Sequence, residues 1–565
     1  MTRNFSKKAI LILGILTAAT TFNSCVAEDD LSTTEPTRYT ASDIKSYADL
    51  FKVFWTVMDQ RYNYFYEQKR NDGMDWDAVY REYYPKFEAL QAFNTGNDKD
   101  IIENQKIARQ YFTDIVDPII DRHFAVDITL PYSKGVQGTF RFRGGMKTPA
   151  NNQYDFKVKT TYMADKLGAD AKSENTVLNN PDGTKSTFTY QMGSLKSNPD
   201  TYYFSFNMFR LSEALKINLL DAYLKPDPGH GLVLTSDIIK NSAELNSISD
   251  AALRSKVENF TIDILNQWNT FPNSAEVKSF NNYISTFKDT EVISDAFLDV
   301  TKKSLEESKK LVAYNKASTY PADVLTTESQ AYIVWFISQM DNHVKWGYGL
   351  TSFQNAAQGI IDKAPFYKQF LNALHKGEIK KIIIDLRANG GGAIADARFW
   401  TDRFITQNAL AGYQRTKEGT GRFNYTPWVP MHTNPHKFGI PSNIPTVILT
   451  DRGSVSMSEI STLMLKSQGS HVISVGDYSA GGLAALTGSD EFNGGTQDKV
   501  AGYLSFYMPV MAHKDAKGEV IEGIGIKPDI YVTPPSDAEL LEMKNSPKTF
   551  VDRVLEAAIK YISTK

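Results

Sequence analysis

Two segments of the sequence carry groups that could catalyse the attack of a hydroxyl on a carbonyl carbon. In the first, the apolar run Ile382–Leu386 continues into Arg387-Ala388-Asn389 and then into three glycines, Gly390–Gly392. The apolar run predicts a buried strand, and the glycines predict a sharp turn that leaves main-chain N–H groups unpaired. Unpaired N–H groups can stabilise the oxyanion that forms during the attack.

The second segment is a cluster of serines further along the chain. Pro445–Thr450 predicts another buried strand and Ser458–Lys466 predicts a helix, so Ser456 lies where a strand leads into a helix N-terminus. The helix dipole and the free N–H groups of the first turn stabilise negative charge at that point. Ser456-Met457-Ser458-Glu459 also spells a capping box, in which the serine oxygen only accepts a hydrogen bond from the helix. Spacing alone leaves both interpretations open.

These two segments and a third, Gly525-Ile526-Lys527-Pro528-Asp529, resemble the motifs of the tail-specific, or C-terminal processing, serine peptidases and occur in that family's order. The resemblance implies that Ser456 is the nucleophile. It also implies an oxyanion hole made by the main-chain N–H groups of Met457 and Gly391, and an α/β catalytic core of the ClpP/crotonase-like kind.

One departure from the family pattern concerns the catalytic base. Many members carry a lysine in a segment like V-G-E-x-T-x-G-K-G, but Val475–Leu483 has Gly482 at the lysine position. Either catalysis is lost, or the chain resembles the branch of the tricorn core protease, which uses a histidine and a carboxylate. In that branch the histidine closes a helical N-terminal domain in a D-x-H context, which maps onto His123. The carboxylate precedes G-x-x-P-D and maps onto Glu522.

The resemblance to this branch therefore implies a triad of Ser456, His123 and Glu522. Histidine suits the role of base because its unperturbed pKa is about 6.5, near the working pH, and the carboxylate would fix its tautomer. Arg122 departs from the tricorn protease, which has a serine beside its histidine. The chemistry needs no cofactor. No metal site is expected, because the remaining histidines show no paired spacing like H-E-x-x-H and the chain has one cysteine.

The N-terminus reads as an export signal. Basic residues precede the apolar stretch Ala9–Phe22, and the only cysteine, Cys25, follows at once. Phe22-Asn23-Ser24-Cys25 resembles a bacterial lipoprotein box, which implies a signal peptide over 1–24 and a lipid anchor on Cys25. The implied location is the bacterial cell envelope, as an outer-membrane lipoprotein facing the periplasm or the surface. The alternative is an ordinary cleaved signal peptide with an incidental cysteine.

Length and patterning predict several domains. A chain of 565 residues is too long for one core, and a formal charge of −3 gives no basic surface for nucleic acid. We expect a polar tether over 25–39, an N-terminal helical domain over 40–125, a β-rich region over 126–235, a helical insert over 236–335 and the catalytic α/β core over 336–565. The β-rich region is interpreted either as a diverged PDZ domain or as an unrelated insert.

The sequence thus favours a serine endopeptidase of the cell envelope that acts on peptides or on unfolded or C-terminal protein segments. Two alternatives stay open. The first is a peptidase fold that has lost catalysis and binds peptides or other ligands, which the missing lysine motivates. The second is an envelope scaffold whose helical insert recruits partners. The oligomeric state is not predicted.

Overall fold

A computed structural model of the chain describes residues 39–146, 154–225, 234–344, 349–418, 421–484, 499–509 and 511–565. The expected signal peptide, Cys25 and the tether up to residue 38 lie outside these ranges. The chain divides into two compact units. Unit 1 comprises Met1–Asn151, Leu410–His432 and Tyr478–Lys527; unit 2 comprises Asn152–Ala409, Thr433–Asp477 and Pro528–Lys565. Within the described ranges, every helix is too short or too polar to cross a lipid bilayer.

Unit 1 begins with the helices expected over 40–125. They are η2 (Ala41–Asp43), α3 (Tyr47–Arg61), α4 (Phe65–Asp72), α5 (Trp76–Glu88) and α6 (Asp98–Val116). Side chains of Ser46, Asp75 and Asn97 cap three of these helices by accepting hydrogen bonds from first-turn N–H groups. The helical N-terminal region predicted from the apolar periodicity is confirmed.

Two antiparallel sheets complete unit 1. One has the strand order β11-β12-β1-β2 and the other β13-β7-β8. The strands are β1 (Ala125–Ser133), β2 (Val136–Arg143), β7 (Leu410–Thr416), β8 (Val429–His432), β11 (Lys499–Val500), β12 (Leu504–Tyr507) and β13 (Met511–Asp515). Apolar side chains of α3, α6, β1 and β12 share one core. The loop between α6 and β1, which carries His123, is therefore anchored at both ends.

Unit 2 is built on a mixed sheet with the order β14-β10-β9-β6-β5-β4-β3. The strands are β3 (Lys172–Asn179), β4 (Lys185–Leu195), β5 (Asn198–Phe206), β6 (Lys381–Asp385), β9 (Thr446–Thr450), β10 (Val472–Gly476) and β14 (Ile530–Tyr531). The strands from β5 to β14 run parallel. Because β6 and β9 are parallel neighbours, the turns that follow them emerge at the same edge of the sheet.

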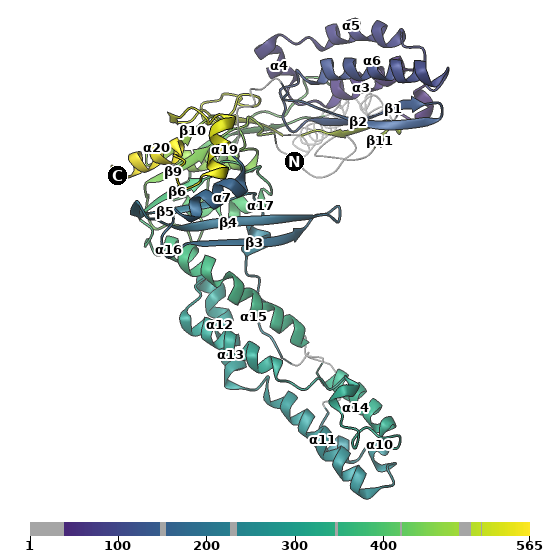
Figure 1. Cartoon of the computed structure of the whole chain (residues 1–565), viewed down its shortest axis with the longest axis vertical. Coiled ribbons are helices and arrows are strands. Elements are labelled where there is room, and N and C mark those ends of the chain that lie inside the picture. The colour runs from purple at the N-terminus through teal and green to yellow at the C-terminus, as the bar shows by residue number, and fades with distance from the viewer. Residues whose placement is uncertain are drawn as a thin grey trace, which may run out of the picture. The chain divides into compact units, whose positions relative to one another are not determined.

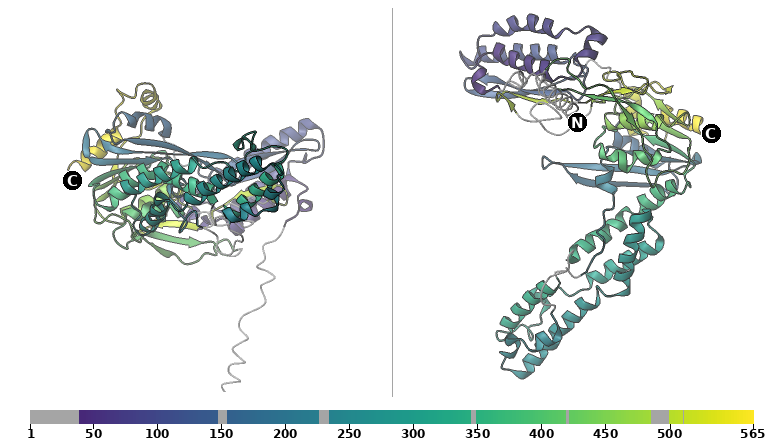
Figure 2. Two further views of the ribbon diagram at one scale, coloured as in Figure 1. Left: turned by 90° about the horizontal axis from the view of Figure 1, so that it is seen from below. Right: turned by 180° about the vertical axis from the view of Figure 1, so that it is seen from behind.

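Helices cover both faces of this sheet, which explains why its central strands are continuous apolar runs. One face packs against α7 (Phe156–Ala164), α19 (Asp537–Asn545) and α20 (Arg553–Ile562), with α20 lying along the sheet in Figures 1 and 2. The other face packs against η4 (Tyr367–Leu371), α17 (Ala395–Phe399), η5 (Thr401–Phe404) and α18 (Met457–Lys466). Along β6, Ile383 faces the first layer and Ile384 the second.

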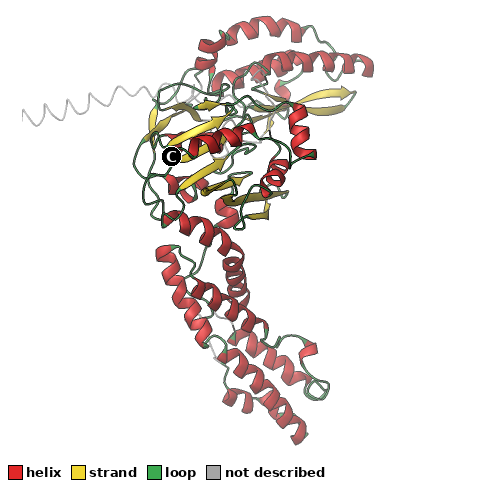
Figure 3. Ribbon diagram, turned by 60° about the vertical axis from the view of Figure 1, so that its left-hand side comes forward, coloured by secondary structure: helices red, strands yellow, loops and turns green. Residues whose placement is uncertain are grey.

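The stretch 236–375 of unit 2 contains helices and loops in its described residues (Figure 3). Its helices are α9 (Ser236–Lys240), α10 (Ala243–Asn246), α11 (Ala251–Thr270), α12 (Ala275–Thr290), α13 (Asp295–Lys309), η3 (Ala317–Thr319), α14 (Gln330–His343), α15 (Gly349–Phe366) and α16 (Asn372–His375). The short helix α8 (Leu211–Leu215) precedes them. The helical stretch therefore continues beyond the expected boundary at 335, because most of α14 and then α15, η4 and α16 precede β6, the first strand after the insert.

The region 126–235 differs from the expectation of a separate β-rich module. Its strands β1 and β2 belong to unit 1, whereas β3, β4 and β5 belong to the mixed sheet of unit 2. The reason is that β5 pairs in parallel with β6, from Thr201 opposite Lys381 to Ser205 opposite Asp385. The strands of residues 126–235 therefore do not form one separate domain, of the PDZ type or otherwise.

A buried cluster of charges fixes the end of β6. The Arg387 guanidinium is fully buried and bonds to the carboxylates of Asp385 and Asp552, at 2.7 and 2.8 Å. Lys159 adds a third contact, at 3.2 Å from Asp385. Burial would raise the pKa of Asp385, but the charges of Arg387 and Lys159 outweigh it and hold that pKa well below its usual value. Asp385 therefore stays ionised at neutral pH, and the cluster ties the chain after β6 to the start of α20.

We expect Arg387→Met to destabilise the protein by about 3–5 kcal/mol, because it leaves two buried carboxylates without their cation. Urea unfolding followed by circular dichroism measures the change. The matched control is Arg553→Met, which removes an arginine paired with Glu539 on the surface of the same unit and is expected to cost less than about 1 kcal/mol. Equal effects of the two substitutions would contradict the structural role of the buried cluster.

Candidate active site

The turn after β6 is closed from inside by the side chain of Asn389. This residue is fully buried, its Nδ2 donates to the carbonyl of Phe206 at 2.8 Å, and its Oδ1 accepts from the N–H of Gly391 at 3.0 Å. Ala388 and Gly391 have φ values of 57° and 82°, in the left-handed region that glycine adopts without strain. The glycine turn predicted from the sequence is therefore present, and Asn389 determines its shape.

The turn after β9 presents Ser456 in a strained conformation. Its backbone has φ 58° and ψ −115°, values that a non-glycine residue rarely adopts and that cluster at functional sites. Ser456 is half-buried and directly precedes α18. It thus lies at the junction of a strand and a helix N-terminus, as the sequence predicts.

The capping-box interpretation explains Glu459 better than it explains the serine hydroxyl. Glu459 Oε2 accepts a hydrogen bond from Ser456 N–H at 2.9 Å. The N–H of Glu459 donates at 2.9 Å to the main-chain carbonyl of Ser456. The Ser456 side chain has the placement of a capping box toward the same N–H, but it accepts no cap hydrogen bond. The hydroxyl of Ser456 is therefore not needed to begin α18.

The other two serines of the cluster join the two turns together. Ser454 Oγ donates to the carbonyl of Leu386 at 2.8 Å, and Ser458 Oγ donates to Asn389 at 2.8 Å. Both side chains are fully buried. Their hydroxyls hold the serine segment against the glycine turn.

Asp451 completes this connection with its carboxylate. Its Oδ1 accepts from the N–H groups of Ala388 and Gly453, at 3.0 and 2.9 Å, and so bridges the two turns. The Val455 N–H adds a main-chain bond to the carbonyl of Asn389 at 3.0 Å. The position of Ser456 relative to the glycine turn is thus set by a continuous hydrogen-bond network.

The two predicted oxyanion donors differ in availability. A Cβ on Gly391 would lie 2.7 Å from Ser456 Cβ and 2.9 Å from Met457 N, so the glycine directly adjoins both groups. Within the described part of the chain, Met457 N–H has no main-chain acceptor. The Gly391 N–H, by contrast, already donates to Asn389 Oδ1. Met457 N–H is therefore the donor that is free in this state.

In unit 1, His123 lies in the loop between α6 and β1. Its main-chain N–H donates to Asp121 Oδ1 at 2.8 Å, and its ring Nδ1 is buried without a hydrogen-bond partner among the described residues. Burial, with the positive charge of Arg122, lowers the pKa of His123 to about 4. The imidazole is therefore neutral at physiological pH and able to accept a proton.

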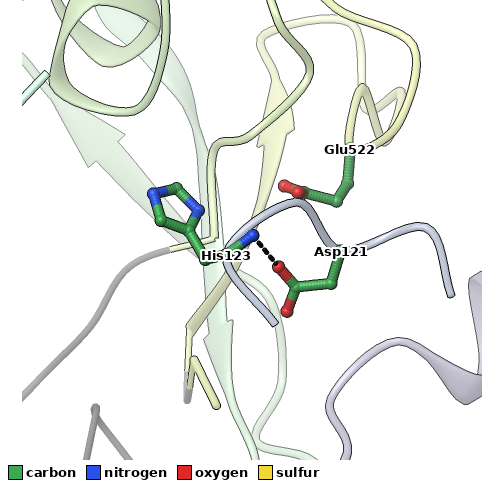
Figure 4. Close-up of side chains that lie close together, drawn as sticks. All are labelled: Asp121, His123 and Glu522. Carbon is green, nitrogen blue, oxygen red and sulfur yellow. Dashed lines mark hydrogen bonds between the residues drawn. The ribbon is translucent and has the colours of Figure 1, made fainter. Parts of the chain in front are cut away.

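The carboxylate of Glu522 is turned toward this imidazole (Figure 4). Glu522 is 1% exposed, and its Oε2 accepts from the N–H groups of Leu483 and Ala484 at 2.8 and 2.9 Å. The Arg122 N–H and the Tyr64 hydroxyl donate to the same carboxylate, at 3.2 and 3.4 Å. Such donors favour the ionised carboxylate even where it is buried. An ionised carboxylate beside a neutral imidazole is the arrangement that stabilises a transient imidazolium.

The same side chains were considered as a metal site. One ligand atom each of Asp121, His123 and Glu522 lies within 4.8 Å of the others, which is close enough to surround a divalent cation. However, Glu522 Oε2 already accepts three hydrogen bonds. A cation would have to displace these donors, so the surroundings of Glu522 fit a carboxylate held by N–H and O–H donors beside an imidazole better than a metal centre.

The predicted site residues fall into two groups. Ser456, Met457 and Gly391 adjoin one another in unit 2, and His123 and Glu522 adjoin one another in unit 1. The joining of the two groups into one triad stays a prediction.

Sequence reasoning gave no role to several polar residues that support these groups. Asp451 directly follows β9, and Asn389 lies in the turn after β6, so their positions at the sheet edge are a signal that could have identified them. Tyr64 donates to Glu522 across a large distance in sequence. No pattern in the sequence points to that contact.

Comparison with known proteins identifies one segment of the chain. Residues 349–532 match peptidase family S41. A "Probable CtpA-like serine protease" of Staphylococcus aureus (strain N315) is 29% identical over 206 residues, which is 36% of this chain and 36% of the relative. The chain thus spans about a third of the length of the curated relatives that it matches. The resemblance of this segment to the tail-specific serine-type peptidases is therefore confirmed.

Two solved structures cover most of the chain at low similarity. One is described as that of a peptidase from Parabacteroides merdae ATCC 43184, with 14% identity, a TM-score of 0.43 and coverage of 92% of this chain and 97% of the other. The second is mature CPAF complexed with lactacystin, with 9% identity, a TM-score of 0.41 and coverage of 92% and 99%.

We expect Gly391→Ala to destabilise the protein by about 2–4 kcal/mol, because the new methyl group would lie 2.5 Å from the carbonyl of Val455 and because φ is positive. Thermal unfolding measures the loss. Gly390→Ala is the matched control: nothing lies within 4 Å of its Cβ position, and we expect a change within about 1 kcal/mol. A neutral Gly391→Ala would show that the two turns do not pack as described.

Proposed function

Because residues 349–532 belong to the serine-type peptidases of family S41, we propose that the chain is a serine endopeptidase that hydrolyses peptide bonds in peptides and in unfolded or C-terminal protein segments. The observation that carries the proposal is the strained backbone of Ser456 next to the free N–H of Met457. A hydroxyl that accepts no cap hydrogen bond, beside an N–H group that has no acceptor among the described residues, suits nucleophilic attack on a carbonyl.

In the proposed mechanism His123 accepts the proton of Ser456 as Oγ attacks and later delivers it to the leaving amine. Glu522 holds the imidazole tautomer and stabilises the imidazolium. Two observations support these roles: the imidazole is neutral, and the carboxylate beside it is supplied with hydrogen-bond donors. The mechanism requires the histidine and the carboxylate of unit 1 to serve the serine of unit 2.

The oxyanion is bound first by Met457 N–H in this mechanism. The Gly391 N–H joins it by exchanging Asn389 Oδ1 for the developing oxyanion, which is a stronger acceptor. Hydrogen bonds of an unliganded site often rearrange in this way when the substrate arrives. Each of the two donors would contribute about 100- to 1000-fold to turnover.

The cellular setting belongs to the same proposal and rests on the sequence. The export signal over 1–24 and the lipoprotein box at Cys25 support a lipid-anchored protein of the bacterial cell envelope, in the outer membrane. We also propose that the α/β core has a ClpP/crotonase-like fold, because its three motifs occur in the order found in the tail-specific peptidases.

A second candidate function is a peptidase fold that binds peptides or other ligands without cleaving them. Gly482 at the position of the family's lysine favours it. The two candidates differ in whether Ser456 is activated, and a covalent probe measures this directly.

We expect a fluorophosphonate probe to label the wild-type protein at Ser456, and we expect Ser456→Ala and His123→Ala each to reduce peptide cleavage below about 1% of wild type. Ser467→Ala, at the other end of α18, is the matched control and keeps its activity. Circular dichroism verifies that each variant is folded. Absence of labelling in the folded wild type supports the binding function, and cleavage by Ser456→Ala above a few per cent excludes this serine as the nucleophile.

The pH dependence of cleavage follows from the lowered pKa of His123. A general base must be neutral, and the neutral imidazole dominates above a pKa of about 4. We therefore expect kcat/KM to rise through about pH 4 and to reach its plateau well below pH 6.5. Rates measured from about pH 3.5 to pH 8, with folding monitored in parallel, give the midpoint. A midpoint at or above the ordinary histidine value would contradict the buried, neutral state of His123.

A further inference from the structure

A second buried carboxyl group, that of Asp121, lies beside the His123–Glu522 pair (Figure 4). Asp121 is fully buried in the loop between α6 and β1. Its Oδ1 accepts hydrogen bonds from the main-chain N–H groups of His123 and Phe124, at 2.8 and 3.1 Å. The Asp121 side chain thus fixes the short piece of backbone from which the imidazole projects.

The hydrogen-bond donors around the two carboxyl groups are unequally distributed. Glu522 accepts from three main-chain N–H groups and the Tyr64 hydroxyl. Asp121 accepts from two N–H groups, both at Oδ1, and its buried Oδ2 has no partner among the described residues. Two buried carboxyl groups this close do not both ionise, so the negative charge stays where more donors stabilise it. That site is Glu522, and the proton remains on Asp121.

The charge state of Asp121 matters for the histidine. A second negative charge next to the imidazole would stabilise the imidazolium further and raise the pKa of His123. The histidine would then be protonated, and unable to act as a base, over a wider range of pH. A protonated Asp121 avoids this effect. Burial raises the pKa of Asp121 to about 7, so the carboxyl group carries its proton below about pH 7.

The other titratable groups that face this cluster do not replace Asp121 in this role. They are Tyr62, Tyr64, Arg122, Tyr507 and His513. Burial raises the pKa values of the three tyrosines above their ordinary value, and burial lowers the pKa of His513 to about 4. The tyrosines and His513 are therefore neutral between about pH 5 and pH 8.

We propose that Asp121 is a positioning residue for His123: it holds the loop through two main-chain N–H groups and carries the proton of the carboxyl pair, so that Glu522 is the only negative charge beside the imidazole. The inference rests on the proposed function, in which His123 is the general base. Asp121 does not contact the substrate and acts through the histidine alone.

The first test compares two substitutions in the full-length protein. Asp121→Ala removes both hydrogen bonds to the loop, and we expect kcat to fall about 30- to 100-fold with KM changed by less than about 3-fold, because the base is displaced while the substrate still binds. Asp121→Asn keeps an uncharged acceptor at the same place and should restore kcat to within about 5-fold of wild type. Asp127→Asn, on β1 outside the cluster, is the matched control with unchanged kinetics. Equal losses in Asp121→Asn and Asp121→Ala, or no loss in Asp121→Ala, would overturn the proposal.

The second test does not depend on turnover. The pKa of His123 is measured by NMR of protein labelled with 15N-histidine, with His123→Ala used to assign the signal. Because Asp121 is neutral in the proposal, Asp121→Asn should leave the pKa of His123 within about 0.3 units of wild type, whereas Glu522→Gln should lower it by about 1 unit. A fall of about 1 unit in Asp121→Asn would show that Asp121 carries charge and would overturn the proposal. This readout still tests Asp121 if Ser456 proves not to be a nucleophile.

Discussion

The candidate site depends first on the hydrogen bonds that join the turn after β6 to the turn after β9. Parallel pairing brings both turns to one edge of the sheet. The strained backbone of Ser456 costs about 1–3 kcal/mol and persists only if its surroundings determine it. Ser454, Ser458 and Asp451 supply that restraint with buried hydrogen bonds to Leu386, Asn389 and Ala388. The serines flanking Ser456 are therefore structural, which leaves the half-buried hydroxyl of Ser456 available for chemistry.

The group of His123 and Glu522 is also held by buried hydrogen bonds, and here the bonds surround a carboxyl group. A buried carboxylate is costly unless donors surround it. Glu522 meets this condition with main-chain N–H groups, whose positions are fixed by the fold. Burial keeps His123 neutral until it accepts a proton. In both groups, then, the backbone supplies most of the polar contacts, and the few reactive side chains are held by it.

The sequence predicted the parts of the site that depend on local pattern. The strand expected over Pro445–Thr450 is observed as Thr446–Thr450, and the helix expected over Ser458–Lys466 begins one residue earlier. Apolar runs that are buried on both faces leave little freedom in such elements. The partners of strands could not be predicted in the same way. β5 has the alternation and composition of a strand, but its pairing with β6 joins residues far apart in the chain. The strands of the expected β-rich region therefore belong to two different sheets. Buried polar contacts such as that of Tyr64 with Glu522 have no local signature at all.

The segment after β10 gives a physical reason for the missing lysine. In the family's lysine branch this stretch carries the base, whereas here the N–H groups of Leu483 and Ala484 point at Glu522 Oε2. Gly481 packs against the turn that holds Glu522: its carbonyl accepts from Gly523 N–H at 2.7 Å, and a Cβ at Gly481 would lie 2.7 Å from the Ile524 nitrogen. The main-chain N–H groups of Leu483 and Ala484 are therefore occupied by hydrogen bonds to the Glu522 carboxylate. A lysine ammonium at Gly482, which is itself buried, would have to compete with those N–H groups for the same carboxylate and would neutralise the charge that a histidine base needs. Gly482 therefore lies in a segment whose main-chain N–H groups hold the carboxylate of Glu522.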